Sequence, residues 1–242
     1  MNASTASAST SASTDPATTG AVTTGASTTG ASTPGASKTG ASTTSATTSI
    51  ATTTPPPPLG EPSEWTELVT LDPTIRLDIR YATADNFVGE PLYACGRCFL
   101  RPAAAAALAR AHAALRSRGY GGLLLFDCYR PRPVQQKMWD RVPDEDAVAP
   151  PWRGSNHNRG IAVDLSLVDA DGAELDLGTP YDQFSARSAH SFKRLPAEVL
   201  RRRADLRGAL EAEGFAAYNL EWWHYSFTAG RWPLADATWE CP

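Results

Sequence analysis

The stretch that decides the fold is IAVDLSL, residues 161–167. Large apolar residues, beginning with Ile161, occupy alternate positions, and small or polar residues, including Asp164, occupy the positions between them. This alternation predicts a β-strand with one face turned to an apolar core. The other face carries small side chains, so we expect Asp164 to look out from the sheet with room beside it.

Other periodic segments lie on both sides of this strand. Strands are expected at residues 74–81, 123–128 and 220–227, and helices at 102–118, 134–142 and 196–213. Pro102 opens the first long helix, Gly119 follows it, and Gly214 follows the last helix, as is typical of helix ends. Short strands are interspersed with helices and long polar connections. We therefore predict an α+β fold, a single domain with a central, mainly antiparallel sheet flanked by helices.

The first 58 residues have a different composition. Ala, Ser, Thr and Gly dominate them, glycine recurs every five residues from Gly20 to Gly40, and Pro55–Pro58 end the segment. A five-residue period matches no helix or strand, and the apolar area is too small to offset the entropy of ordering. We expect residues 1–58 to be a disordered tail and 59–242 to be the folded domain. A neutral spacer is the favoured role of the tail, and a glycosylated stalk is the alternative.

Charge and hydropathy exclude two classes of partner. The net charge is −4 and the basic residues are scattered, so no nucleic acid partner is expected. The longest apolar run, Leu123–Phe126, is far shorter than the roughly 18–20 residues of a membrane span. The N-terminus lacks the charged start and apolar core of a recognisable signal peptide. Localisation in the cytoplasm or the cell envelope, and the oligomeric state, both stay open.

The chain has four cysteines, Cys95, Cys98, Cys128 and Cys241. Four cysteines allow three pairings, and the sequence does not choose among them. Cys95 and Cys98 form a lone CxxC, which is only half of a structural zinc site. Because no second pair stands at suitable spacing, buried or paired thiols are favoured over a metal site.

Two histidines and two acids have a spacing that suggests chemistry. His157 lies seven residues before Asp164, an offset that puts them on opposite faces of a straight strand, but Gly160 permits a bend that unites them. Glu221 and His224 are three apart, so they share a face on a helix, or on a strand with a bulge. Each residue also has an ordinary reading, as a solvated loop histidine, a locally bonded aspartate or a surface glutamate.

If the four converge, they fit zinc-dependent hydrolysis. A catalytic zinc site has three protein ligands, an open position for water and a nearby carboxylate that is not a ligand. Bound zinc lowers the pKa of water to about 7. We predict His157, Asp164 and His224 as ligands and Glu221 as general base. The remaining histidines, at positions 112 and 190, are read as structural.

Four separate motifs resemble one known family. SNHNRGIAVD (155–164) fits an SxHxxGxAxD pattern and EWWH (221–224) fits ExxH, while RYATADNF (80–87) and FDCYRPRP (126–133) resemble a YAT-x-DNF element and a DGYRP loop. In this order, over about residues 64–228, the chain resembles the D-alanyl-D-alanine dipeptidases, including the vancomycin-resistance dipeptidases, within the wider group of zinc D,D-peptidases.

The resemblance implies one zinc ion per chain, held by the three ligands predicted above, with Glu221 as base. It also implies that Arg130 steadies the developing oxyanion, as a fixed guanidinium at a strand end can do. Asp182, in LGTPYDQF, matches an acid that holds the free amino group of the substrate. Ser155 and Tyr81 match residues that line the small dipeptide pocket.

The expected activity is therefore hydrolysis of D-Ala-D-Ala, a small D,D-dipeptide substrate, by the domain at 59–242. One alternative is a D,D- or L,D-carboxypeptidase or endopeptidase that acts on longer peptidoglycan peptides. Another is a non-catalytic wall-peptide binding module with structural zinc, although such a closed site needs neither Glu221 nor Arg130. The short stretch between Arg130 and Ser155 departs from the family, as do Cys95 and Cys98. The physiological role stays open.

Overall fold

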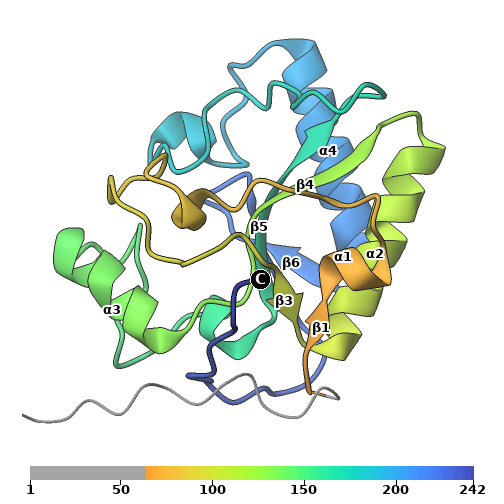
Figure 1. Cartoon of the computed structure of the whole chain (residues 1–242). Coiled ribbons are helices and arrows are strands. Elements are labelled where there is room, and N and C mark those ends of the chain that lie inside the picture. Colours follow the sequence, from red (N-terminus) through yellow and green to blue (C-terminus); the bar gives the residue numbers. More distant parts are fainter. Residues whose placement is uncertain (1–63) are drawn as a thin grey trace, which may run out of the picture. The chain divides into compact units, whose positions relative to one another are not determined.

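The computed structural model describes residues 64–242, and its centre is a five-stranded sheet (Figure 1). The strand order is β2-β4-β5-β7-β6, in which only the β2–β4 pairing is parallel. The strands are β2 (Arg76–Leu77), β4 (Gly122–Asp127), β5 (Ala162–Val168), β6 (Phe215–Ala217) and β7 (His224–Phe227). The prediction of an α+β fold with a mainly antiparallel sheet is confirmed. The predicted tail, residues 1–58, lies outside the described residues.

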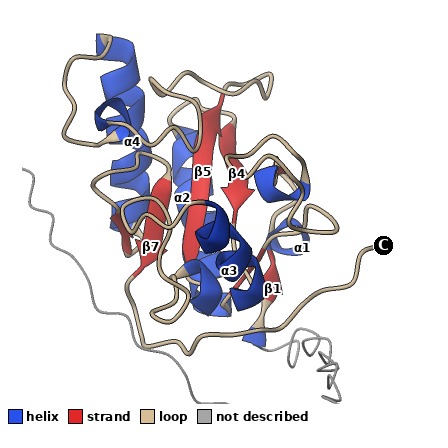
Figure 2. Cartoon of the chain, turned by 90° about the vertical axis from the view of Figure 1, so that its left-hand side faces the viewer, coloured by secondary structure: helices blue, strands red, loops and turns tan. Residues whose placement is uncertain are grey.

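Helices cover both faces of the sheet. They are α1 (Leu68–Leu71), α2 (Pro102–Ser117), α3 (Arg132–Arg141) and α4 (Ala197–Ala212). Helices α2 and α4 pack against each other, α2 on β4 and α4 on β5 and β6, whereas α3 lies across the opposite face (Figures 1 and 2). Three short 3-10 helices, η2 (Arg80–Ala82), η3 (His157–Arg159) and η4 (Ala186–Ser188), lie in the connections. None of the helices in this part of the chain is long and apolar enough to cross a membrane.

A second, two-stranded sheet closes one side of the domain. Its strands, β1 (Thr66–Glu67) and β3 (Phe99–Leu100), are antiparallel. Phe99 forms a small aromatic cluster with Trp65 and Tyr129, and Trp239 from the C-terminal segment packs on it. Through this cluster, the C-terminal segment packs against the turn that follows β4.

The main core lies between the sheet and the α2–α4 layer. Val163, Leu165 and Leu167 of β5 are fully buried, as their alternation predicts. Helix α2 begins at Pro102, whose missing N–H costs nothing at a helix start. The buried face of α2 is mostly alanine, and small side chains allow a helix to approach a sheet closely. Close approach in turn buries the large residues of β4 and β5.

His112 has a structural role, as predicted. Its Nδ1 accepts the Leu123 N–H at 3.1 Å, and its Nε2 lies 2.9 Å from the hydroxyl of Thr74. Gly122 has a φ of +124°, and a Cβ there would collide with the His112 ring. His190 packs its ring against Tyr225, with centroids 5.9 Å apart. Both histidines therefore belong to the packing of the fold.

Two predicted strands are shorter than expected. Only Arg76–Leu77 of the segment 74–81 pairs with β4, because the chain then turns into η2. The apolar side chains of Ile75, Ile79 and Tyr81 are nevertheless buried. The alternation therefore indicates side chains that pack at the sheet edge, although the backbone forms no continuous strand there. Similarly, strand β7 begins at His224, and the earlier part of the segment 220–227 is a turn.

All four cysteines form disulfides. Cys95 pairs with Cys241, and Cys98 pairs with Cys128. The preference for paired thiols over a metal site is confirmed, and the CxxC residues bond to distant partners instead of to each other. One disulfide joins the C-terminal segment to the loop before β3. The other joins that loop to the residue that follows β4.

The Cys98–Cys128 disulfide should contribute measurably to stability. It closes a loop with a sequence separation of 30 residues. Constraint of the unfolded chain over such a loop is worth about 3–4 kcal/mol. We expect the Cys98→Ser/Cys128→Ser double variant to lose about that much free energy of unfolding in urea titrations. The Cys95→Ser/Cys241→Ser variant opens a loop with a sequence separation of 146 residues, so by the same argument it should lose at least as much. An unchanged unfolding midpoint in the first variant would contradict the prediction.

Candidate active site

The register of three strands places polar side chains in a row. Asp164 of β5 lies opposite His224 of β7 on one side and opposite Asp127 of β4 on the other. Residues directly opposite in antiparallel strands project from the same face of the sheet. The β4–β5 ladder has an irregularity between Leu125 and Asp127, which brings Asp127 into this row. The row lies on the sheet face away from α2 and α4.

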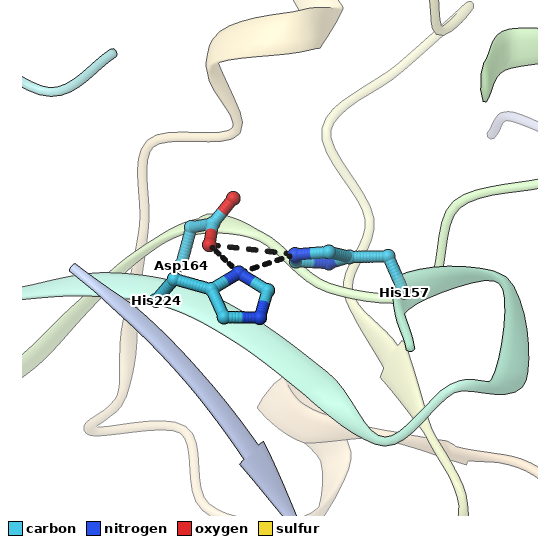
Figure 3. Close-up of side chains that lie close together, drawn as sticks. All are labelled: His157, Asp164 and His224. Atoms are coloured by element: carbon cyan, nitrogen blue, oxygen red, sulfur yellow. Dashed lines mark hydrogen bonds and ion pairs between the residues drawn. The ribbon is translucent and has the colours of Figure 1, made fainter. Parts of the chain in front are cut away.

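His157 reaches the row from the 3-10 helix before β5. Gly160 ends η3 with a φ of +71°, and a Cβ there would collide with the ring of Trp65. The left-handed backbone of Gly160 supplies the bend that His157 needs in order to reach Asp164. Figure 3 shows His157 pointing toward Asp164 and His224 from the opposite side. The three side chains therefore converge although they come from three separate segments.

Three atoms form the centre of the cluster, namely His157 Nε2, Asp164 Oδ1 and His224 Nδ1. Their separations are 3.0 Å between Asp164 and His224, 3.2 Å between the two imidazoles, and 3.4 Å between His157 and Asp164. Tetrahedral zinc with bonds of about 2.0–2.1 Å has ligand atoms about 3.3–3.4 Å apart. The residues present thus fit a tetrahedral metal ion, with one position left for another ligand.

Hydrogen bonds outside the cluster fix the ligand atoms. His157 Nδ1 lies 2.7 Å from the carbonyl oxygen of Cys128, which can only accept, so Nδ1 carries the proton. The Nε2 lone pair is then free for a metal. The hydroxyl of Tyr181 donates to Asp164 Oδ2 at 3.0 Å, which leaves Oδ1 facing the histidines. Such outer contacts are what holds a metal ligand in its binding orientation.

The environment favours the protonation states that bind a divalent cation. Burial opposes ionisation of Asp164, but the charge and hydrogen bonds of His157 and His224 outweigh it and lower the pKa of the carboxyl. Burial lowers the pKa of His224, although Asp164 opposes the shift. An ionised carboxylate beside neutral imidazole is the ligand form that metals require.

Arg130 is buried next to the cluster, with 7% of its surface exposed. Its Nε and Nη2 donate to Asp127 Oδ2 at 2.9 and 2.6 Å, and its Nη1 donates to Gln135 at 2.9 Å. Nη2 also lies 3.9 Å from Asp164 Oδ2. Removal of one partner from such a buried pair is strongly destabilising. Arg130 is therefore a fixed cation at the edge of the site.

One cavity of about 380 Å³ opens onto the cluster. All eight residues singled out from the sequence line it: Tyr81, Arg130, Ser155, His157, Asp164, Asp182, Glu221 and His224. The fold thus gathers residues that span most of the domain into one hollow.

Glu221 lies on the turn before β7, where its N–H donates to the Tyr218 carbonyl at 3.2 Å. The expectation of a helix or a bulged strand for the ExxH motif is therefore wrong, because a turn brings the two side chains to one cavity. Only 8% of Glu221 is exposed. Burial raises the pKa of its carboxyl, and the charges of Asp164 and Asp182 act in the same direction. A glutamate of this kind holds a proton more readily than an exposed glutamate does.

Asp182 and Tyr81 lie together in another part of the cavity lining. The Tyr81 hydroxyl donates to Asp182 Oδ2 at 2.9 Å. Asp182 has a φ of +58°, and no other non-glycine residue within 64–242 has a positive φ. Local strain of this kind often marks functional positions. Ser155 lies beside the ligands instead, where its hydroxyl oxygen accepts the His157 N–H at 3.2 Å.

Three residues that no sequence pattern singled out support the site. Asp127 holds Arg130, the Cys128 carbonyl orients His157, and Tyr181 holds Asp164. An acid that ends an apolar strand, as Asp127 does, is a usable signal because a buried carboxylate needs a partner. Nothing local distinguishes a backbone carbonyl or one tyrosine among seven.

Comparison with known proteins agrees with this geometry. A family model described as D-Ala-D-Ala dipeptidase, peptidase M15, matches residues 63–238. A D-alanyl-D-alanine dipeptidase of Escherichia coli K12 is 33% identical over 184 residues, which cover 76% of this chain and 95% of the relative.

Two further D-alanyl-D-alanine dipeptidases are similar. The one from Enterococcus faecium is 34% identical over 172 residues, 62% of this chain and 85% of its own length. The one from Streptomyces coelicolor is 35% identical over 173 residues, 63% of this chain and 85% of its own. The residues matched by the family model, 63–238, include every segment that lines the cavity. The chain therefore belongs to the peptidase M15 family of D-Ala-D-Ala dipeptidases and is a metallopeptidase of that family.

Proposed function

We propose that this chain hydrolyses free D-Ala-D-Ala with the help of one zinc ion held by His157, Asp164 and His224. The observation that carries the proposal is the convergence of these three ligand atoms within 4.8 Å of one another in a cavity that also holds a buried acid. Two imidazoles and one carboxylate in tetrahedral spacing suit zinc. The names of the relatives supply the D-Ala-D-Ala substrate.

The residues around the ligands supply the rest of the chemistry. When bound, the ion acts as a Lewis acid that polarises the peptide carbonyl and makes water a nucleophile near neutral pH. Glu221, buried and not one of the three ligands, takes the proton of the attacking water and returns it to the leaving amine. Arg130, held by Asp127, donates hydrogen bonds to the oxygen where negative charge develops.

The far part of the cavity selects the substrate. Asp182 supplies a carboxylate for the ammonium of a free amino terminus, and Tyr81 holds that carboxylate by a hydrogen bond. A partly buried acid that is matched to an ammonium rejects a blocked terminus, because the negative charge of the acid is then left without its counter-ion. The cavity of about 380 Å³ suits a small ligand. These features favour a dipeptidase over a carboxypeptidase or endopeptidase that acts on longer wall peptides.

A binding module with structural zinc is less well supported. A structural zinc site is closed by four protein ligands. Among the described residues the cluster provides three ligand groups, with Glu221 and Arg130 beside them in the same cavity. Both residues would be costly to bury in a module that performs no reaction.

Substitutions of Glu221 and His224 should distinguish the role of a general base from the role of a metal ligand. Glu221→Gln keeps the shape of the side chain but cannot take a proton, so we expect kcat on D-Ala-D-Ala to fall about 10²- to 10⁴-fold with zinc content unchanged. His224→Ala removes a ligand, so we expect it to lose zinc. Zinc per chain by atomic absorption and amine release measure the two effects. Zinc loss in Glu221→Gln would make Glu221 a ligand and overturn its role as base.

Asp182 should determine the response to the amino terminus. We expect wild-type enzyme to cleave D-Ala-D-Ala much faster than its N-acetyl derivative, and Asp182→Asn to narrow that ratio mainly through KM. Removal of one partner from a buried charged pair costs about 2–5 kcal/mol of binding, so the ratio should change by at least about 30-fold. Ser155→Ala changes a cavity residue beside His157 instead, so it should leave this ratio unchanged even where it lowers the rates on both substrates. Equal rates on both substrates in the wild type would favour the carboxypeptidase alternative.

The disulfides bear on where the protein works. Both bonds lie within residues 64–242, and such bonds persist in oxidising surroundings. Of the two locations left open by the sequence, we propose the cell envelope. Alkylation of protein taken directly from its native cells should find no free thiols among the four cysteines. Recovery of reduced cysteines would support the cytoplasm.

A further inference from the structure

Tyr181 lies behind the active site and does not line its cavity. It lines a neighbouring hollow of about 370 Å³ together with Asp182, the next residue in the chain. Its ring packs between Phe126, at a centroid distance of 4.7 Å, and Trp223, at 5.6 Å. Aromatic neighbours on both sides fix the direction of the hydroxyl. Any influence of this hydroxyl on a substrate in the active-site cavity therefore passes through other residues.

The hydroxyl of Tyr181 lies between the two halves of the site. It is 3.0 Å from Oδ2 of Asp164, a predicted metal ligand, and 3.2 Å from the hydroxyl of Tyr81. Tyr81 in turn donates to Asp182 Oδ2 at 2.9 Å. Four oxygen atoms thus form a continuous chain from the metal cluster to the acid proposed to hold the substrate ammonium.

The number of hydroxyl protons along this chain determines which atoms the Tyr181 hydroxyl donates to. Tyr81 has one hydroxyl proton and donates it to Asp182, so the Tyr81 oxygen can only accept from Tyr181. Tyr181 also has one proton, with two acceptors in reach. The two acceptors share this proton, and Asp164 has the larger share because an ionised carboxylate is a stronger acceptor than the phenol oxygen of Tyr81. That bond occupies Oδ2 and leaves Oδ1 toward His157 and His224.

We propose that Tyr181 is a positioning residue that holds Asp164 in its ligand orientation and couples it to the Tyr81–Asp182 pair. This inference rests on the proposed function, because it assumes that Asp164 binds zinc and that Asp182 binds the amino terminus. The inference goes beyond the proposed function because it assigns a role to Tyr181, a residue that would contact neither the zinc ion nor the dipeptide. A tyrosine that served only to pack would be replaced without loss by phenylalanine.

The test compares Tyr181→Phe with Tyr225→Phe. Both substitutions delete one buried hydroxyl and keep the ring. Tyr225 is the neighbour of His224 in β7, and its hydroxyl has no hydrogen-bond partner among the described residues. It therefore controls for the loss of a hydroxyl near the site. Unfolding midpoints of both variants establish that the fold is kept.

The first readout is zinc affinity, measured by competition with a chromogenic chelator in the absence of substrate. We expect Tyr181→Phe to weaken zinc binding about 10- to 100-fold, the usual effect of a lost contact to a metal ligand, and Tyr225→Phe to leave it unchanged. The second readout is made at saturating zinc. The preference in kcat/KM for D-Ala-D-Ala over its N-acetyl derivative should fall about 2- to 10-fold in Tyr181→Phe, the worth of one hydrogen bond.

The outcomes separate the two proposals. Wild-type zinc affinity and substrate preference in a folded Tyr181→Phe protein would overturn the role of Tyr181 and leave the dipeptidase proposal intact. Weaker zinc binding with an unchanged preference would overturn the coupling to Asp182. A wild-type chain that takes up no zinc, or that binds zinc without cleaving the dipeptide, would overturn the proposed function and this inference with it.

Discussion

The site depends on the register of β5 with its two neighbours. Because side chains alternate between the two faces of a strand, a slip of one residue would turn Asp164 into the core and expose the apolar set that now packs under α2 and α4. The observed register sets Asp164 between Asp127 and His224 on one face. Burial of the apolar face therefore fixes the polar row as well, and the same interaction that stabilises the sheet builds the site.

The second constraint is the cost of burying so many charges. Asp127, Asp164 and Arg130 are each less than 10% exposed, and isolated ions in such places are strongly destabilising. Asp127 and Arg130 offset each other by direct hydrogen bonds. Within residues 64–242, the polar groups close to Asp164 are the two histidines and the Tyr181 hydroxyl, with Arg130 at 3.9 Å. A divalent cation would complete the balance, which is why the cluster has the composition of a metal site.

A disulfide and several hydrogen bonds hold the backbone around this cluster in place. The Cys98–Cys128 disulfide anchors the residue whose carbonyl orients His157. Two residues later, the Arg130 N–H donates to the His157 carbonyl, and Asn158 returns a bond to the Arg130 carbonyl. The turn after β4 and the 3-10 helix before β5 are therefore tied together at several points. A proposed metal ligand and the proposed oxyanion donor share one rigid unit, so the distance between them is fixed before any substrate arrives.

The sequence by itself determined the elements and the inventory of reactive groups. Alternation indicated β5, and helix-end chemistry indicated α2 and α4. Spacing suggested His157, Asp164, Glu221 and His224, and the family resemblance added the other four candidates that are among the residues lining the cavity. These signals depend on near neighbours in the chain. Only the tertiary structure decided which cysteines pair, that Glu221 stands on a turn, and that Asp127, Cys128 and Tyr181 support the ligands. Those contacts join segments separated by many residues, and their partners are set by strand register and loop packing, which no local pattern records. Tyr181 illustrates the limit, since its position beside Asp164 exists only after the loop beyond β5 has folded back over the sheet.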